Sequence, residues 1–330
     1  MAHASRRGRK RAFTPDPTLR RDIAQEITDQ IVGLLETGDE LPWRQPWRST
    51  GARLPLRHDG TAYRGINVFL LGLRAMGRGY SSPYWMSFRQ ALELGAAVRK
   101  GERGTTVVYY GVTRKQAADD VVEIGQSGDG DASEGDGTRR FLKHYTAFNA
   151  EQIDGLPERY HPARAIDAIE GPIADRRIGP IADAMIDGLG VGYEEGGDRA
   201  CYIPGLDRIM MPPIHRFRDA EAYYATRFHE CAHATEAPSR LAIDYGAKVF
   251  GNEAYAKGEL YAELTASMLG AHLGFAPGHI ENHAAYVQSW LKVLRSDKRF
   301  ILKAAADAQR GVDYLLAAAA ADRVTAVAAE

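Results

Sequence analysis

Residues 227–233 read Arg227-Phe228-His229-Glu230-Cys231-Ala232-His233, which places two histidines and a glutamate in the spacing HExxH. If this segment is helical, the histidines lie one turn apart on the same face, and both imidazoles can reach one metal ion. Glu230 projects to the side of that pair, where it can take a proton from water instead of binding the metal. Asp219 is the expected N-cap, and Pro238 ends the helix. The motif predicts a catalytic Zn2+ site, with another divalent transition metal as the alternative occupant.

A catalytic zinc needs a third protein ligand, and the next expected helix, residues 253–273, offers two acids on one face. Glu259 and Glu263 lie one turn apart, whereas His272 falls on the opposite side, about 220° around the helix. Spacing alone does not decide which acid binds the metal and which orients a ligand histidine through the ring nitrogen that does not bind the metal. The pattern Glu259-Leu-Tyr-Ala-Glu263 resembles the ExxA(D/E/N) helix of gluzincin metallopeptidases, which implies Glu259 as the ligand and Glu263 behind it.

This ligand set predicts hydrolysis of a carbonyl compound, most readily a peptide bond. Zinc lowers the pKa of a water that it holds towards about 7, and Glu230 would act as the general base on that water. Tyr255 and Tyr261 are candidates to polarise the tetrahedral intermediate, and the sequence does not separate them. The alternative is a zinc ion that serves structure alone.

A basic and aromatic segment lies far upstream, between residues 41 and 110. It holds eleven Lys or Arg residues against three acids, a local net charge of +8, together with three of the four tryptophans. Single-stranded nucleic acid is bound by such a mixture, because cations neutralise phosphates and unstacked bases lie on aromatic rings. The alternative is that the rings build a core. The residues predicted to contact DNA are Trp43, Arg44, Trp47, Arg48, Tyr63, Arg64, Tyr84, Trp85, Arg89, Lys100 and Arg103.

The overall composition bounds the class of protein. The chain has 330 residues, of which 45% are hydrophobic and 26% charged, and this excludes wholesale disorder and fibrous rods. The formal net charge of -1, taken alone, argues against a nucleic-acid partner. This average hides the basic segment at 41–110, so it does not exclude such a partner. Two cysteines form no disulfide framework, and no apolar run approaches the ~18 residues of a membrane span. A cytoplasmic protein without a membrane partner is expected.

The chain is expected to fold as two α+β domains, of which the second is mostly helical. Residues 1–20 form a basic arm expected to be disordered, and residues 21–155 form a DNA-binding domain with a flexible acidic loop at 119–137. A linker is expected at 156–164. Residues 165–318 form the zincin-like metallopeptidase domain, with a strand pair at 200–203 and 208–211, and residues 319–330 form an alanine-rich tail.

Taken together, the two halves resemble ArdC-type antirestriction proteins, and also the related segment of the plasmid primase TraC. The first half carries the resemblance in Asp59-Gly-Thr-Ala-Tyr63-Arg-Gly-Ile-Asn67, in Trp85, in Lys100-Gly101 with Arg103-Gly104-Thr105, and in Tyr145-Thr-Ala-Phe148-Asn149-Ala-Glu151-Gln152. The second half carries it in the HExxH motif, in Ser239-Arg240-Leu241, in Phe250-Gly251 with Glu253-Ala-Tyr255-Ala, in 259–263, and in Trp290-Leu291 with Asp297-Lys298.

The resemblance implies a protein of a conjugative or other mobile element that binds single-stranded DNA and protects it from host restriction. Two features depart from the family pattern: Gly258, where a larger residue is usual, and the acidic loop at 119–137. The alternative hypothesis is a cytosolic zinc metallopeptidase whose basic N-terminal half recognises an acidic protein partner instead of DNA. Competition between an oligonucleotide and an unstructured acidic protein separates the two.

Overall fold

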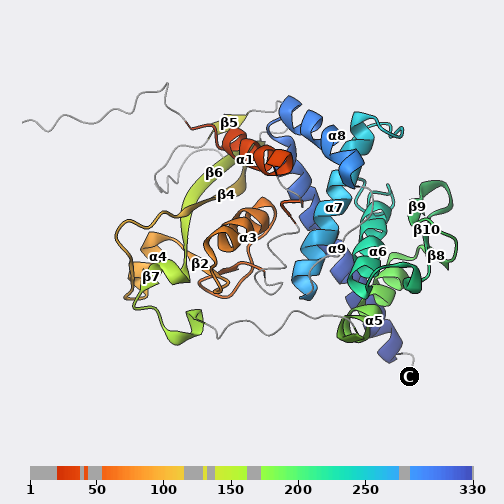
Figure 1. The fold of residues 1–330 in the computed structure, drawn as a ribbon, viewed down its shortest axis with the longest axis horizontal. Coiled ribbons are helices and arrows are strands. Elements are labelled where there is room, and N and C mark those ends of the chain that lie inside the picture. The colour runs from red at the N-terminus through yellow and green to blue at the C-terminus, as the bar shows by residue number, and fades with distance from the viewer. Residues whose placement is uncertain are drawn as a thin grey trace, which may run out of the picture.

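The computed structural model describes residues 21–37, 41–43, 54–114, 129–131, 138–161, 172–274 and 283–328. Several predictions from the sequence concern other residues: the basic arm at 1–20, most of the acidic loop, and Arg44, Trp47 and Arg48. Within the described ranges, the chain forms a sheet-containing first half and a mostly helical second half, seen on the left and right of Figure 1. The expected α+β class with two domains is confirmed.

The first half is built on a twisted sheet with the strand order β1-β2-β6-β4. Its strands are β1 (Leu56–Arg57), β2 (Tyr84–Met86), β4 (Thr105–Arg114) and β6 (Thr138–Asn149), and β5 (Asp129–Asp131) also pairs with β6. The long β4–β6 hairpin runs from the pair Thr105↔Ala147 to the pair Arg114↔Thr138. Part of the expected acidic loop thus adds a short strand to this hairpin.

Helix α3 (Ile66–Arg78) packs on the sheet, and one of its side chains forms hydrogen bonds with the backbone of the edge strand β4. The side-chain amide of Asn67 donates to the carbonyl oxygen of Val108, and its oxygen accepts from the Val108 amide, both at 2.8 Å. One asparagine side chain therefore replaces a neighbouring strand at this position of β4, so that the buried backbone groups remain paired. The short elements α4 (Phe88–Glu93), β3 (Ala97–Val98) and β7 (Ile153–Asp154) complete this half.

The second half consists of helices around a small sheet. The helices are α5 (Pro172–Leu189), α6 (Ala220–Thr235), α7 (Glu253–Leu273), α8 (His283–Ser296) and α9 (Phe300–Ala328). The sheet has the order β8-β10-β9, with β8 (Gly192–Glu195) parallel and β9 (Cys201–Ile203) antiparallel to β10 (Arg208–Met211). The expected strand pair is thus confirmed. Strand β9 lies at an edge of this sheet, beside α6.

The N-terminal segment of the first half, residues 21–37 and 41–43, packs on the second half. Helix α1 (Ile23–Thr37) lies against α8 (Figure 1). The Trp43 ring meets the Trp290 ring edge-on at 5.5 Å between centroids. The Thr28 hydroxyl donates to the carbonyl oxygen of Lys298 at 2.7 Å. Both halves therefore share one large hydrophobic core, which also includes Ile31 and Leu294.

Two expectations about connecting segments need correction. The part of the expected linker that the structure describes packs on the first half: Tyr160 is fully buried, and its hydroxyl donates to the carbonyl oxygen of His58 at 2.9 Å. The alanine-rich end is not a separate tail up to residue 328, because α9 continues through it. Alanine has the highest helix propensity, so a run of alanines extends a helix that packing has already started.

Candidate metal centre

Two capped helices position the site. The carboxylate of Asp219 accepts from the Ala222 amide at 2.7 Å, which confirms it as the N-cap of α6. Asn252 caps α7 in the same way, through the Tyr255 amide at 2.8 Å. The two helices pack against each other, so that the HExxH face of α6 meets the acidic face of α7.

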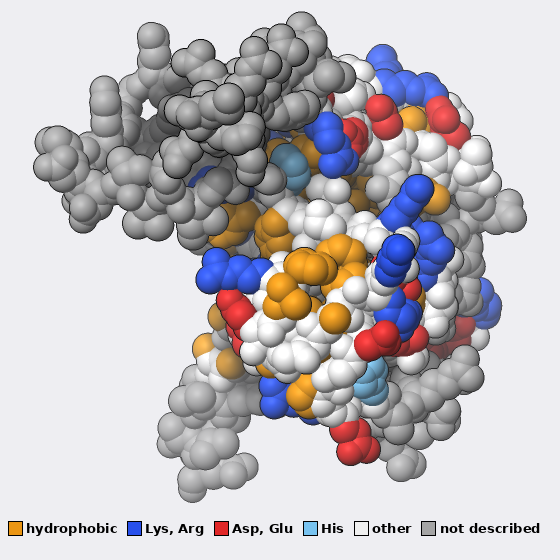
Figure 2. All heavy atoms as spheres, turned by 90° about the vertical axis from the view of Figure 1, so that its left-hand side faces the viewer, with side chains coloured by type: hydrophobic (Ala, Val, Ile, Leu, Met, Phe, Trp, Pro, Cys, Tyr) orange, Lys and Arg blue, Asp and Glu red, His pale blue; other side chains and the backbone are white. Residues whose placement is uncertain are grey.

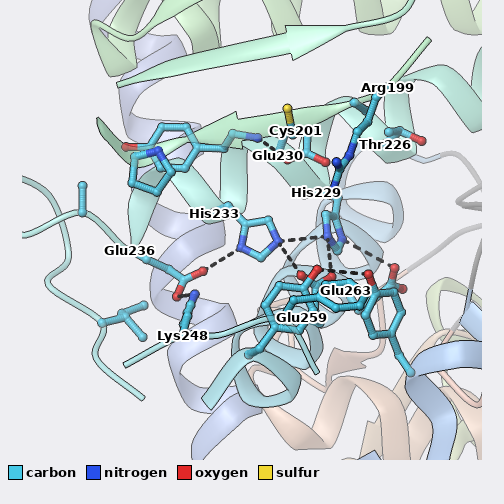
Figure 3. Close-up of a pocket in the computed structure, with 18 of the residues that line it drawn as sticks. Arg199, Cys201, Thr226, His229, Glu230, His233, Glu236, Lys248, Glu259 and Glu263 are labelled. Carbon is cyan, nitrogen blue, oxygen red and sulfur yellow. Dashed lines mark hydrogen bonds and ion pairs between the residues drawn. The ribbon is translucent and has the colours of Figure 1, made fainter. Parts of the chain in front are cut away.

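Three donor groups converge between these helices, as Figure 3 shows. The Nε2 atoms of His229 and His233 are 3.1 Å apart. The two carboxylate oxygens of Glu259 lie 3.4 Å from His229 Nε2 and 3.6 Å from His233 Nε2. Tetrahedral zinc with bonds of about 2.0–2.1 Å places its ligand atoms roughly 3.3 Å apart. The donors are therefore close enough together to hold one ion of this size.

Carboxylates also lie behind both histidines, on their other ring nitrogens. Glu263 Oε1 is 3.5 Å from His229 Nδ1, and Glu236 Oε1 is 2.7 Å from His233 Nδ1. A hydrogen-bonded carboxylate fixes the tautomer and the rotation of a metal-binding imidazole, as Glu236 does for His233, while Glu263 lies at ion-pair distance from His229. Glu259 thus faces the atoms that would hold the ion, and Glu263 faces away from them. Sequence reasoning missed Glu236, although its position three residues after His233 places it on the same helix face.

The charges of this cluster are strongly coupled. Burial disfavours the charged form of His229, yet Glu259 and Glu263 raise its pKa well above the ordinary value. Burial likewise opposes ionisation of Glu259, but the two histidines and the Tyr255 hydroxyl hold its pKa at about 2. Glu259 is therefore a carboxylate throughout the neutral range, which is the form that binds a metal ion.

Glu230 lies apart from the three converging donors. Figure 3 shows it on the β9 side of the histidines, with Glu259 and Glu263 on the other side. Its Oε2 accepts from the Tyr202 amide of β9 at 2.7 Å. This contact fixes one oxygen of the carboxylate, and it comes from the strand that borders the site.

A cavity of about 980 Å³ opens onto this centre. Tyr255 and Tyr286 both line it, and their hydroxyl oxygens are 3.1 Å apart. Tyr261, the other tyrosine considered from the sequence, is fully buried and bonds the Thr235 hydroxyl. Cys201 also lines the cavity, whereas Cys231 is fully buried and burial raises its pKa to about 12. Of the two tyrosines that the sequence offers, Tyr255 is therefore the one that a substrate can reach, and its partner Tyr286 was not indicated by the sequence.

Arg240, in the Ser239-Arg240-Leu241 segment, holds the end of the HExxH helix in place. Its guanidinium binds both carboxylate oxygens of Asp207 at 2.8–2.9 Å, the carbonyl oxygen of Ala234 at 3.0 Å and that of Leu189 at 3.2 Å. These groups belong to α6, to the end of α5 and to the turn before β10. A planar fork of donors suits this arrangement, since one side chain satisfies terminal helix carbonyls and an acid together.

The predicted DNA-contacting rings are mostly in the core, which corrects their expected role. Trp43 and Trp85 are each 1% exposed, and Tyr63 is 3% exposed, so their faces cannot stack on bases. The half-buried Tyr84 packs edge-on against Tyr160. Large aromatic side chains bury most apolar area, and here that gain decides their location.

The predicted cations are more accessible. Arg64 pairs with Asp313 of α9, and Arg89 pairs with Glu93 of its own helix, while Lys100 and Arg103 are exposed. Figure 2 shows Lys and Arg side chains gathered beside exposed hydrophobic side chains on this face of the molecule. The Arg74 guanidinium reaches the Arg103 carbonyl oxygen at 3.3 Å, and the charges of Arg74, Arg78 and Arg99 all act on Tyr80. The cationic cluster consists of Arg74, Arg78, Arg99, Lys100 and Arg103.

The paired histidines, the acid from the following helix and the separate Glu230 define a zincin-like metallopeptidase site. A family model described as a zincin-like metallopeptidase matches residues 180–307, and one for the N-terminal domain of anti-restriction factor ArdC matches residues 21–148. The chain belongs to the ArdC antirestriction family. It is 42% identical to the metal-free crystal structure of antirestriction ArdC protein from plasmid R388, covering 91% of this chain and 98% of that one, with a TM-score of 0.70.

Other relatives extend this comparison. The Mn(II)-bound structure of the same R388 protein is 41% identical, with a TM-score of 0.71 and coverage of 91% and 99%. An uncharacterized protein, y4eC, of Sinorhizobium fredii is 38% identical over 89% of this chain and 91% of its own length. DNA primase TraC of Escherichia coli is 36% identical over 91% of this chain, which spans 27% of that primase. The fold and the converging donors support a divalent metal ion at this site. Among the described helices, none is long and apolar enough to cross a membrane.

Proposed function

We propose that this protein binds single-stranded DNA through its first half, protects incoming mobile-element DNA from restriction, and hydrolyses peptide bonds at a Zn2+ centre in its second half. The observation that carries the peptidase part is the convergence of His229, His233 and Glu259, with donor atoms 3.1–3.6 Å apart. Zinc is the proposed ion because two imidazoles and one carboxylate, with room left beside them, are typical of catalytic zinc.

The side chains around the centre suit peptide hydrolysis. A divalent ion held there supplies Lewis acidity towards a water and a carbonyl group. Tyr202 fixes one oxygen of Glu230, and the other is free to take the proton of the attacking water and pass it to the leaving amine. The hydroxyl pair of Tyr255 and Tyr286 lies where a donor can stabilise negative charge on the carbonyl oxygen. Glu263 and Glu236 keep the two imidazoles oriented throughout.

DNA binding is supported by the cationic cluster and by exposed rings on the same half. Tyr109 and Tyr145 of the β4–β6 hairpin are 56% and 39% exposed, and Phe88 of α4 is 52% exposed. Exposed rings and exposed cations on one half of a protein favour single strands over duplex, because only unstacked bases offer their faces. The family supports antirestriction as the setting of this activity.

Replacing Lys100 and Arg103 together with alanine is expected to weaken oligonucleotide binding severalfold. The slope of log K against log salt concentration should fall by about 1.4, since each lost phosphate contact removes about 0.7 for single strands. A fluorescence titration of the full-length protein at several salt concentrations measures both effects. Arg208→Ala is the matched control, because it removes an exposed arginine, paired with Glu194, from the other half. Unchanged slopes, or preferential binding of an unstructured acidic protein over the oligonucleotide, would refute this part of the proposal.

A further inference from the structure

Gly258 leaves space for a lysine. It lies inside α7, directly before Glu259, and a glycine there weakens a helix. A Cβ atom at this position would lie 2.7 Å from Cε of Lys248 and collide with its Nζ. The missing side chain therefore allows the Lys248 ammonium to cross the surface of α7 beside the metal centre.

The lysine that uses this space pairs with Glu236. Their contact is an ion pair in which the Glu236 side chain is 9% exposed and the Lys248 side chain 34%. The other oxygen of Glu236 accepts from His233 Nδ1 at 2.7 Å. Figure 3 shows the resulting chain of contacts from Lys248 through Glu236 to His233.

The loop that carries Lys248 is anchored on both sides of it. The Tyr245 hydroxyl donates to Asp307 of α9 at 3.0 Å, and the side-chain amide of Asn252 donates to the Ala247 carbonyl oxygen at 2.8 Å. Lys248 is thus presented to Glu236 from a fixed position. A buried carboxylate with a fixed cationic partner keeps one orientation, and an imidazole bonded to it keeps one rotation.

We propose that Lys248 is a positioning residue of the metal centre: it holds Glu236 against His233, so that His233 Nε2 points at the ion, and its ammonium group lies in the space that Gly258 leaves. This inference depends on the proposed metal site but not on hydrolysis. Loss of a group that orients a metal-binding histidine lowers metal affinity about 10- to 100-fold. Lys248→Ala and Gly258→Ala should both produce such a loss, the second because its Cβ displaces the ammonium group.

The two substitutions form a double-mutant cycle with a distinctive outcome. Dissociation constants for Zn2+ are measured by competition with a chelator on the full chain, and Co2+ absorption spectra report the geometry of the ligands. We expect Gly258→Ala to weaken Zn2+ binding about 10-fold when Lys248 is present and to leave it unchanged in the Lys248→Ala background. Equal effects in both backgrounds, or a Lys248→Ala variant with unchanged affinity and Co2+ spectrum, would overturn the inference.

A neighbouring lysine provides the control. Lys257 pairs with Glu253 and lies one residue before Gly258, so Lys257→Ala removes the same charge without touching Glu236. Its Zn2+ affinity should equal that of the wild type, and a comparable loss would also overturn the inference. Circular dichroism of the metal-free variants checks that each is folded. If the wild-type protein binds Zn2+ but hydrolyses no peptide, the proposed peptidase activity is refuted, and the double-mutant cycle still tests the role of Lys248. If the wild-type protein does not bind Zn2+, both proposals are refuted.

Discussion

His229→Ala should reduce bound metal from about one ion per chain to less than about a tenth. The substitution removes the most central donor, whose Nε2 lies within 3.4 Å of both His233 Nε2 and Glu259. It also leaves Glu259 and Glu263 facing each other without the imidazole between them. Elemental analysis after gel filtration in a metal-free buffer measures the effect directly.

Thermal unfolding gives a second measure of the same loss. An ion present at about 1,000 times its dissociation constant stabilises a folded protein by about 4 kcal/mol, so Zn2+ should raise the Tm of the wild type but not that of His229→Ala. The matched control is His272→Ala, because His272 is exposed near the end of α7 and is not among the converging donors. Full metal content in His229→Ala would refute the assigned ligand set.

Glu230→Gln should retain the metal and lose about 10²- to 10⁴-fold in the rate of peptide hydrolysis. Glutamine is the same shape and can still accept from the Tyr202 amide, but it cannot take the proton of the attacking water. The loss corresponds to about 3–5 kcal/mol of transition-state stabilisation. Turnover of an unstructured protein, with metal content measured on the same samples, separates catalysis from binding.

A control on the same helix makes this result specific. Glu221 lies in the first turn of α6 and outside the cavity lining, so Glu221→Gln should keep wild-type turnover. Hydrolysis by Glu230→Gln at the wild-type rate would show that another group takes the proton. Loss of metal in this variant would instead place Glu230 among the ligands.

Much of the metal centre could be predicted because its signals are local. Two histidines four residues apart need only a helix to meet, and the N-caps Asp219 and Asn252 indicate where the two helices begin. The spacing places Glu259 and Glu263 on one helix face but does not say which of them binds the metal. Their distances to opposite nitrogens of His229 distinguish the two positions, with Glu259 near Nε2 and Glu263 near Nδ1.

What the sequence could not supply depends on packing between distant segments. The Trp43 and Trp85 patterns indicate large rings beside cations, and only the fold places these rings in the core. Trp43 meets Trp290, which is far away in sequence, and no local periodicity contains that contact. The role of Gly258 was hidden for the same reason, because the side chain that fills its space comes from the preceding loop. Composition therefore indicates which half of the chain is basic, but it does not indicate which surface of that half would bind DNA.

Zinc K-edge X-ray absorption of the wild-type protein in solution would test the metal centre most directly. The ligand set of His229, His233 and Glu259 predicts two imidazole nitrogens and further oxygen donors at about 2.0–2.1 Å. It also predicts loss of one imidazole contribution, or of the bound zinc, in His233→Ala. A sulfur donor near about 2.3 Å, which would implicate Cys201 in the cavity, would contradict the account, as would an unchanged spectrum and metal content in His233→Ala.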